Sequence, residues 1–147
     1  MKKKVLFICV HNSARSQMAA ALLNKSCGEF YEAKSAGLEA GTLNPLAVEA
    51  LREIEIDISG NKTRRVFDFF TSGELFAYVI TVCSESEAAG CPIFPGVAQR
   101  LHWPFPDPSK FTGTHAEKLE KTREVLEQIR ARIEEFCEEH CAAELTA

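Results

Sequence analysis

The stretch K-K-V-L-F-I-C-V-H-N-S-A-R-S-Q, from Lys3 to Gln17, decides how the rest of the chain is read. Its first half is a largely apolar run that ends on Cys9, and its second half is a short polar loop that reaches Arg15 and Ser16. An apolar run of this kind is typical of a parallel strand covered on both faces. The sequence therefore places a thiol at the carboxyl end of a strand and an arginine six residues behind it.

Strand-like and helix-like segments alternate along the remainder of the chain. This alternation predicts a parallel sheet with right-handed crossovers, and four strands in 147 residues predict a small three-layer α/β domain. Ligands of such sheets lie at the carboxyl ends of the strands, where the strand order reverses, and Cys9 and Cys83 would share that edge. The further strands are expected at 30–35, 78–83 and 99–103, and the helices at 16–25, 65–76 and 114–140, with one more that Asn44 caps and Pro45 opens.

The composition limits the classes of function. The chain has 147 residues, 46% of them hydrophobic, which suits one domain over residues 1–147 with a single core. Its formal net charge of −4 argues against a broad basic surface for nucleic acid but leaves room for a local anion pocket. Neither a signal peptide nor an apolar stretch of the ~20 residues that span a bilayer is recognisable. We therefore expect a cytoplasmic protein with no nucleic-acid or membrane partner.

Six cysteines stand in the chain, and none of them forms a C-x-x-C pair, so no metal site is expected. A core of this size does not require a disulfide scaffold. Cysteines in a reducing compartment are more often buried side chains or redox catalysts. We interpret three of them as structural thiols: Cys27, Cys137 and Cys141.

The loop from Cys9 to Ser16 carries the parts of an anion-binding site. If the strand ends at Cys9 and a helix begins near Arg15, the N–H groups of the loop can point inward at a helix N-terminus. They would stabilise a thiolate, and the guanidinium would hold two oxygens of a tetrahedral oxyanion. Asn12 suits a left-handed bend, and Ser16 can donate to the thiolate. On spacing alone, a free cysteine followed by an exposed arginine at a helix start stays possible. The expected oxyanion-binding residues are Val10, His11, Asn12, Ser13, Ala14, Arg15 and Ser16.

Three motifs in order resemble one known family over essentially the whole chain. The run C-V-H-N-S-A-R-S-Q-M-A at 9–19 resembles the signature of the low-molecular-weight tyrosine phosphatase superfamily, and more closely its arsenate reductase branch. The run V-C-S-E-S-E-A-A-G-C-P at 82–92 resembles the redox segment of that branch, and H-W-P-F-P-D-P-S at 102–109 resembles its Asp-Pro loop. The resemblance implies a flavodoxin-like α/β fold with a four-stranded parallel sheet.

The resemblance also implies a sequence of thiol reactions on arsenate. Cys9 would attack the arsenic while Asp107 protonates the leaving oxygen. If the first and third strands are neighbours, their ends lie about 5 Å apart, so Cys83 can form a disulfide with Cys9. Cys91 would then carry the disulfide to a thioredoxin or a glutaredoxin-type reductant, with no bound cofactor. The expected catalytic residues are Cys9, Arg15, Cys83, Cys91 and Asp107.

Two other functions stay open at this point. One is a tyrosine phosphatase that works through a phosphocysteine at Cys9, and the other is a non-catalytic oxyanion or redox sensor. Ser109 favours the reductase, because phosphatases of this superfamily usually carry an aromatic residue after Asp-Pro. An intact Arg15 and Asp107 argue against a sensor.

The chain departs from the family pattern at three places. The interval from Cys83 to Cys91 is one residue longer than is usual in the reductases, which concerns the details of the loop rearrangement. His11 stands where the phosphatases favour glycine, and no catalytic role is assigned to its side chain. Ala20 replaces a glutamate that helps one reductase branch to bind potassium, so no strong potassium dependence is expected.

Overall fold

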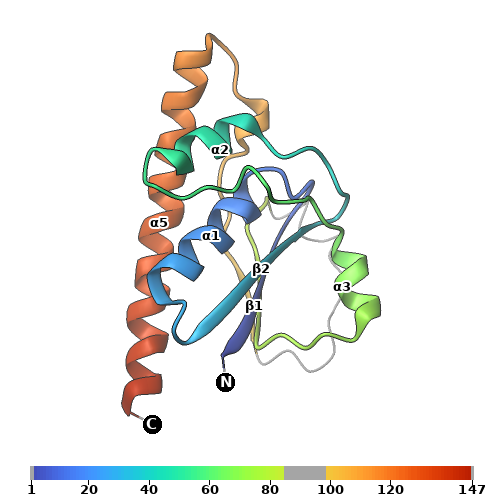
Figure 1. The fold of residues 1–147 in the computed structure, drawn as a ribbon, viewed down its shortest axis with the longest axis vertical. Helices are drawn as coiled ribbons and strands as arrows, with labels where there is room; N and C mark the ends of the chain where they lie inside the picture. Colours follow the sequence, from blue (N-terminus) through green and yellow to red (C-terminus); the bar gives the residue numbers. More distant parts are fainter. Residues whose placement is uncertain (1, 85–98, 147) are drawn as a thin grey trace.

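A four-stranded parallel sheet forms the centre of the protein (Figure 1). The computed structural model describes residues 2–84 and 99–146, so Cys91 lies outside the described residues. The strand order is β2-β1-β3-β4, which makes the first and third strands neighbours. The strands are β1 (Lys3–Cys9), β2 (Tyr31–Gly37), β3 (Tyr78–Thr81) and β4 (Gln99–His102).

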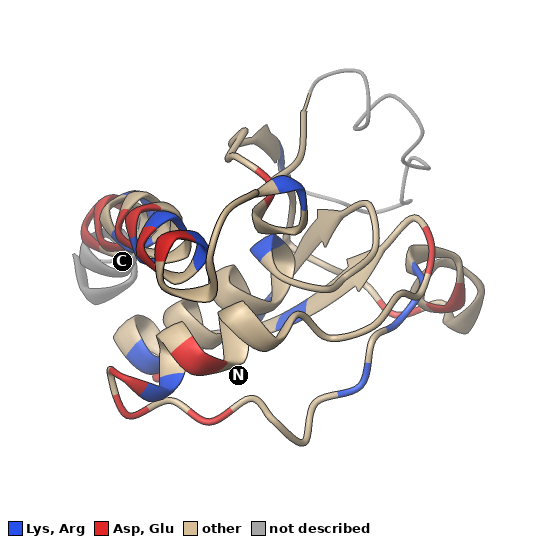
Figure 2. Cartoon of the chain, turned by 90° about the horizontal axis from the view of Figure 1, so that it is seen from above, with Lys and Arg blue, Asp and Glu red and all other residues tan. Residues whose placement is uncertain are grey.

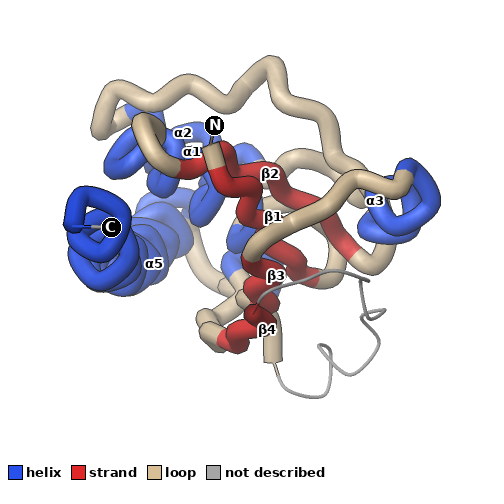
Figure 3. The backbone as a smooth tube through the Cα atoms, turned by 90° about the horizontal axis from the view of Figure 1, so that it is seen from below, coloured by secondary structure: helices blue, strands red, loops and turns tan. Residues whose placement is uncertain are grey.

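Helices cover both faces of the sheet and confirm the three-layer α/β fold. Figure 3 shows α1, α2 and α5 on one side of the strands and α3 on the other. The Asn44 side chain accepts from the Leu46 N–H, and Pro45 is the first residue of α2, as predicted. The helices are α1 (Arg15–Cys27), α2 (Pro45–Arg52), α3 (Val66–Ser72), the short 3-10 helix η1 (Pro108–Lys110) and α5 (His115–Thr146).

The buried strand β1 separates two parts of the core. Because successive side chains of a strand point to opposite faces, Phe7 and Cys9 pack on the side of α1 and α5, and Leu6 and Ile8 pack on the side of α3. All four side chains are at most 2% exposed. Complete burial on both faces explains why β1 reads as an unbroken apolar run.

The carboxyl end of β3 differs from the prediction. The strand ends at Thr81 and the chain bends at Cys83, so Cys83 does not end a strand. In a regular strand, Val82 and Cys83 would face opposite sides of the sheet. Because of the bend, Cys83 packs in the same core cluster as Val82 and Cys9. Both cysteines therefore lie on one side of the sheet.

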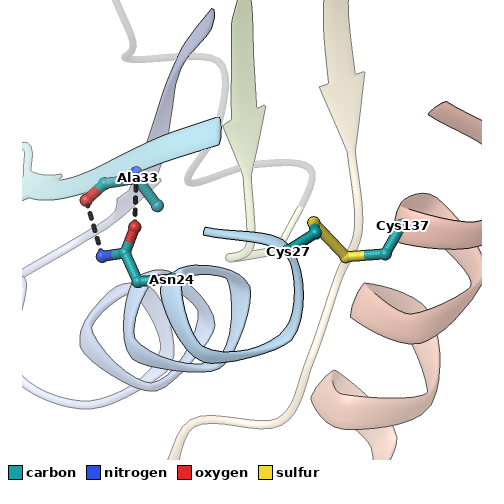
Figure 4. Close-up of a disulfide and its surroundings, with 4 residues drawn as sticks. All are labelled: Asn24, Cys27, Ala33 and Cys137. Atoms are coloured by element: carbon teal, nitrogen blue, oxygen red, sulfur yellow. Dashed lines mark hydrogen bonds between the residues drawn. A yellow bond between two sulfur atoms is a disulfide. The ribbon is translucent and has the colours of Figure 1, made fainter. Parts of the chain in front are cut away.

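The long helix α5 is fastened to α1 and α2. Arg123 makes two bonds to the carboxylate of Glu53, the residue that caps the C-terminus of α2, at 2.8 and 2.7 Å, and these hydrogen bonds lower the pKa of Glu53. A disulfide joins Cys27, the last residue of α1, to Cys137 on α5 (Figure 4). The interpretation of these two cysteines as separate structural thiols was therefore wrong.

Charged residues are spread along α5, as Figure 2 shows. Arg130 pairs there with Glu127 and Glu134 at helical spacing. Within residues 2–84 and 99–146, no helix has both the length and the apolar character needed to cross a bilayer.

Candidate active site

The loop after β1 turns its carbonyl oxygens outward. Three of them, and the carbonyl of Cys9 at the end of β1, accept hydrogen bonds of 2.9–3.0 Å from N–H groups of the segment 38–44. In the described part of the chain, no N–H of residues 10–14 donates to a backbone carbonyl. Groups turned in this way form a nest that binds anions. The bonds run from Leu38, Glu39, Gly41 and Asn44 to Cys9, Val10, His11 and Ser13.

Two residues with unusual backbone requirements make this curl possible. Asn12 has a φ of 55°, the left-handed conformation that was expected of it. Gly37, the last residue of β2, lies so close that a Cβ there would be 2.5 Å from the Asn12 nitrogen. Any other residue at position 37 would push the loop off the sheet edge.

The thiol of Cys9 lies at the base of the loop. Its side chain is buried, and Sγ is 2.9 Å from Ser16 Oγ. Ser16 Oγ also accepts from Asn12 Nδ2 at 2.8 Å, and both of these polar residues are fully buried. Buried polar groups so paired hold their positions rigidly.

The N-terminus of α1 adds to the anion site. Ala14 is the N-cap and supplies no side-chain cap, so the first N–H groups of the helix are not satisfied by a capping side chain. These N–H groups and the positive end of the helix dipole favour an anion beside them.

Arg15 links this loop to the Asp-Pro loop. It is only 4% exposed, which rules out the alternative of an exposed helix-start arginine. One Nη donates to the Phe105 carbonyl at 3.3 Å, and the other is 3.4 Å from Asp107 Oδ2. The guanidinium therefore stands between the two loops, where it can turn its fork to an oxyanion.

Ser109 fixes the carboxylate of Asp107. The Ser109 N–H and hydroxyl both donate to Asp107 Oδ1, at 2.9 and 2.8 Å. From the sequence, Ser109 was expected only to favour a reductase over a phosphatase. The spacing Asp-x-Ser is the local signal for such a turn, because an aspartate readily caps the residue two positions on.

The remaining candidate residues occupy different settings. Cys83 is buried in the cluster that holds Cys9. The His11 side chain is half exposed, with Nδ1 3.7 Å from Glu39 Oε2. Among the described residues, no group of three or more His, Cys, Asp or Glu side chains is arranged to hold a metal ion.

One residue beside the loop was missed. Gln17 is buried, and its side chain bonds to Asn12 and to the segment 61–62. Gln17 stands inside the signature-like run at 9–19, but no role was expected of it, because a glutamine in the first turn of a helix is usually exposed.

Comparison with known proteins gives a consistent result. The family model for low molecular weight phosphotyrosine protein phosphatase matches residues 4–146. The arsenate reductase of Bacillus licheniformis is 42% identical over 139 residues, which cover 93% of this chain and 96% of that protein. The arsenate reductase of Bacillus subtilis is 39% identical over 141 residues, which cover 94% and 98%.

Solved structures agree with the sequence relatives. An arsenate reductase in the phosphate binding state superposes with a TM-score of 0.75 at 28% identity, covering 93% of this chain and 98% of the other. The thioredoxin-dependent arsenate reductase of Corynebacterium glutamicum gives a TM-score of 0.68 at 32% identity. The match covers 99% of this chain and 63% of that protein. A low molecular weight protein tyrosine phosphatase from T. tengcongensis gives 0.75 at 25% identity, covering 94% and 99%.

Proposed function

The chain belongs to the low molecular weight phosphotyrosine protein phosphatase family, and on that basis we propose that it is an arsenate reductase that uses Cys9, Cys83 and Cys91 in turn. The main support is the outward-turned loop around the buried Cys9 thiol, next to Arg15. The sequence relatives named above are arsenate reductases that match nearly the full length of the chain.

The first step is attack on the oxyanion. The N–H groups of residues 10–14 and the Arg15 fork hold three oxygens of arsenate while the Cys9 thiolate approaches the arsenic. An S–As bond forms and an As–O bond breaks. The leaving oxygen is that of an As–OH group, so one proton from Asp107 lets it leave as water. The two bonds from Ser109 hold the carboxyl group beside Arg15 for this transfer.

The second step is the reduction itself. The Cys83 thiolate attacks Cys9 Sγ, so an S–S bond forms and the S–As bond breaks. The electron pair of that bond leaves with arsenic, which becomes arsenite. The common packing of Cys9 and Cys83 beside neighbouring strands supports this step.

The third step regenerates the anion site. The Cys91 thiolate attacks Cys83, which frees Cys9 and leaves a Cys83–Cys91 disulfide. A dithiol reductant of the thioredoxin class then reduces that disulfide by exchange. The electrons thus come from an external thiol and no bound cofactor takes part. Such a supply is available in the cytoplasm, where we place the protein.

A coupled assay tests the proposal. Arsenate, thioredoxin, thioredoxin reductase and NADPH are mixed with the wild type, with Cys91→Ser, or with the control Cys141→Ser. We expect steady arsenate-dependent NADPH loss in the wild type and the control. Cys91→Ser should release about one arsenite per protein, because only the third step is missing, and then stop.

Two outcomes would contradict the proposal. Steady turnover in Cys91→Ser would remove this cysteine from the reaction. A wild type that leaves NADPH untouched but hydrolyses para-nitrophenyl phosphate rapidly would instead be a phosphatase, which shares the first step but releases its phosphocysteine to water.

A further inference from the structure

Gln17 lies behind the loop from Cys9 to Ser16, which is called the anion loop below. Its Nε2 is 3.1 Å from Asn12 Oδ1, 3.2 Å from the Asn12 carbonyl and 3.2 Å from the Lys62 carbonyl. Its Oε1 accepts from Asn61 Nδ2 at 3.1 Å. The side chain is 2% exposed, so both ends of the amide are fixed by protein groups.

These bonds determine which way the Asn12 amide points. Asn12 Oδ1 accepts from Gln17 Nε2 and from the Arg64 N–H, the latter at 2.8 Å. With two donors facing the oxygen, the NH₂ group must face the other way. There it donates to Ser16 Oγ at 2.8 Å.

The direction of that bond decides where the Ser16 proton goes. Since Ser16 Oγ accepts from Asn12, its own hydrogen is free to point at Cys9 Sγ, 2.9 Å away. If the Asn12 amide were reversed, Ser16 would donate to Asn12 Oδ1 instead. The Cys9 thiolate would then lose a buried hydrogen-bond donor, which favours its protonated form.

We propose that Gln17 is a positioning residue of this active site: its amide orients Asn12 so that the Ser16 hydroxyl donates to the Cys9 thiolate. The inference rests on the proposed function only in taking Cys9 as the nucleophile. In this role the Gln17 side chain contacts neither the Cys9 thiol nor the N–H groups of the anion loop. It acts through Asn12 and Ser16 alone.

The test compares two replacements of similar size. Gln17→Met removes the donor and leaves Asn12 oriented by the Arg64 N–H alone. Gln17→Glu places an acceptor where Asn12 Oδ1 needs a donor, so it attracts the Asn12 NH₂ group and reverses the amide. Gln128→Glu makes the same chemical change at an exposed position of α5 and is the matched control.

The measurement is the rate at which iodoacetamide alkylates Cys9, followed by mass spectrometry of its peptide from pH 5 to 9. This rate does not involve arsenate, so it separates failure of this inference from failure of the proposed reaction. At neutral pH we expect Gln17→Glu to slow alkylation about tenfold or more, the effect of losing one hydrogen bond to a charged group. Its rate–pH profile should move to higher pH. Gln17→Met should show a smaller change, and Gln128→Glu none.

A double-mutant cycle excludes a merely structural effect. Ser16→Ala removes the donor itself, so adding Gln17→Glu or Gln17→Met to it should slow alkylation no further. Additive effects would overturn the proposal, and so would an unchanged profile in a folded Gln17→Glu protein. If Gln17→Glu does not fold, the cycle of Gln17→Met with Ser16→Ala replaces it, and additive effects on the alkylation rate would again overturn the proposal.

Discussion

The two ends of α1 place cysteines in opposite settings. At its N-terminus, the helix faces Cys9, which lies among buried hydrogen-bonding groups at the carboxyl edge of the sheet. At its C-terminus, Cys27 is bonded to Cys137 in the contact between two helices. The 13 residues of α1 separate these ends by about 20 Å, so the disulfide lies far from the anion loop.

The backbone surroundings at the two ends suit cysteines for different roles. The carboxyl edge offers N–H groups and a helix N-terminus, which favour a thiolate and an anion. At the other end, Asn24 holds α1 to β2 through the Ala33 N–H and carbonyl, at 2.8 and 3.1 Å (Figure 4). A bond there across 110 residues of sequence restricts the unfolded chain. We therefore expect chemistry at one end of α1 and stability at the other.

Cys9→Ser should have the largest effect on activity, because it changes the cysteine at the N-terminal end of α1. We expect arsenate reduction to fall by about 10⁴-fold or more, the scale seen when a covalent nucleophile is removed. The melting temperature should stay close to that of the wild type, because serine fills the same space. The measurement is arsenite release in a single turnover, alongside a thermal melt. Residual reduction within tenfold of the wild type would remove Cys9 from its proposed role.

A smaller loss is expected from Arg15→Lys. Lysine keeps the positive charge but cannot present two parallel N–H groups to an oxyanion. We predict that kcat/KM for arsenate falls by about 10²–10³-fold, as when one preorganised donor is lost. Arg130→Lys changes the same residue type on the exposed face of α5 and is the control. Equal activities of the two variants would show that the fork of Arg15 is not used.

Cys27→Ala should have the smallest effect on activity and a clear effect on stability. Loss of a disulfide that closes a long loop should lower the melting temperature by about 5–15 °C. Arsenate reduction at 25 °C should stay within about twofold of the wild type. Cys137→Ala and the double variant should melt at the same temperature as Cys27→Ala, since all three lack one and the same bond.

Cys27→Ala also tests whether the Cys27–Cys137 disulfide serves stability alone. Both cysteines line an open surface groove, so a soluble dithiol can reach the wild-type disulfide. Reduced wild type should then melt like Cys27→Ala. A large loss of turnover in Cys27→Ala, with an unchanged melting temperature, would instead show that Cys27 and Cys137 take part in the redox reaction.

Much of the fold could be predicted because its signals are local. The apolar run of β1, the left-handed Asn12 and the Asn44–Pro45 helix start each follow from the residue itself and its neighbours. The end of β3 was misplaced, because an apolar residue such as Val82 fits a strand or a buried bend equally well. The role of Ser109 was missed, since the spacing Asp-x-Ser indicates a turn but does not say where the capped carboxylate points.

The sequence by itself determined that a thiol ends a strand of a parallel sheet and that an arginine begins the next helix, because the strand, loop and helix are contiguous in the chain. Only the tertiary structure decided which distant groups meet there. It joined Cys27 to Cys137 and put Gln17 between Asn12 and the segment 61–62. Those contacts depend on how helices and loops pack across the sheet, and no local pattern of residues encodes that packing.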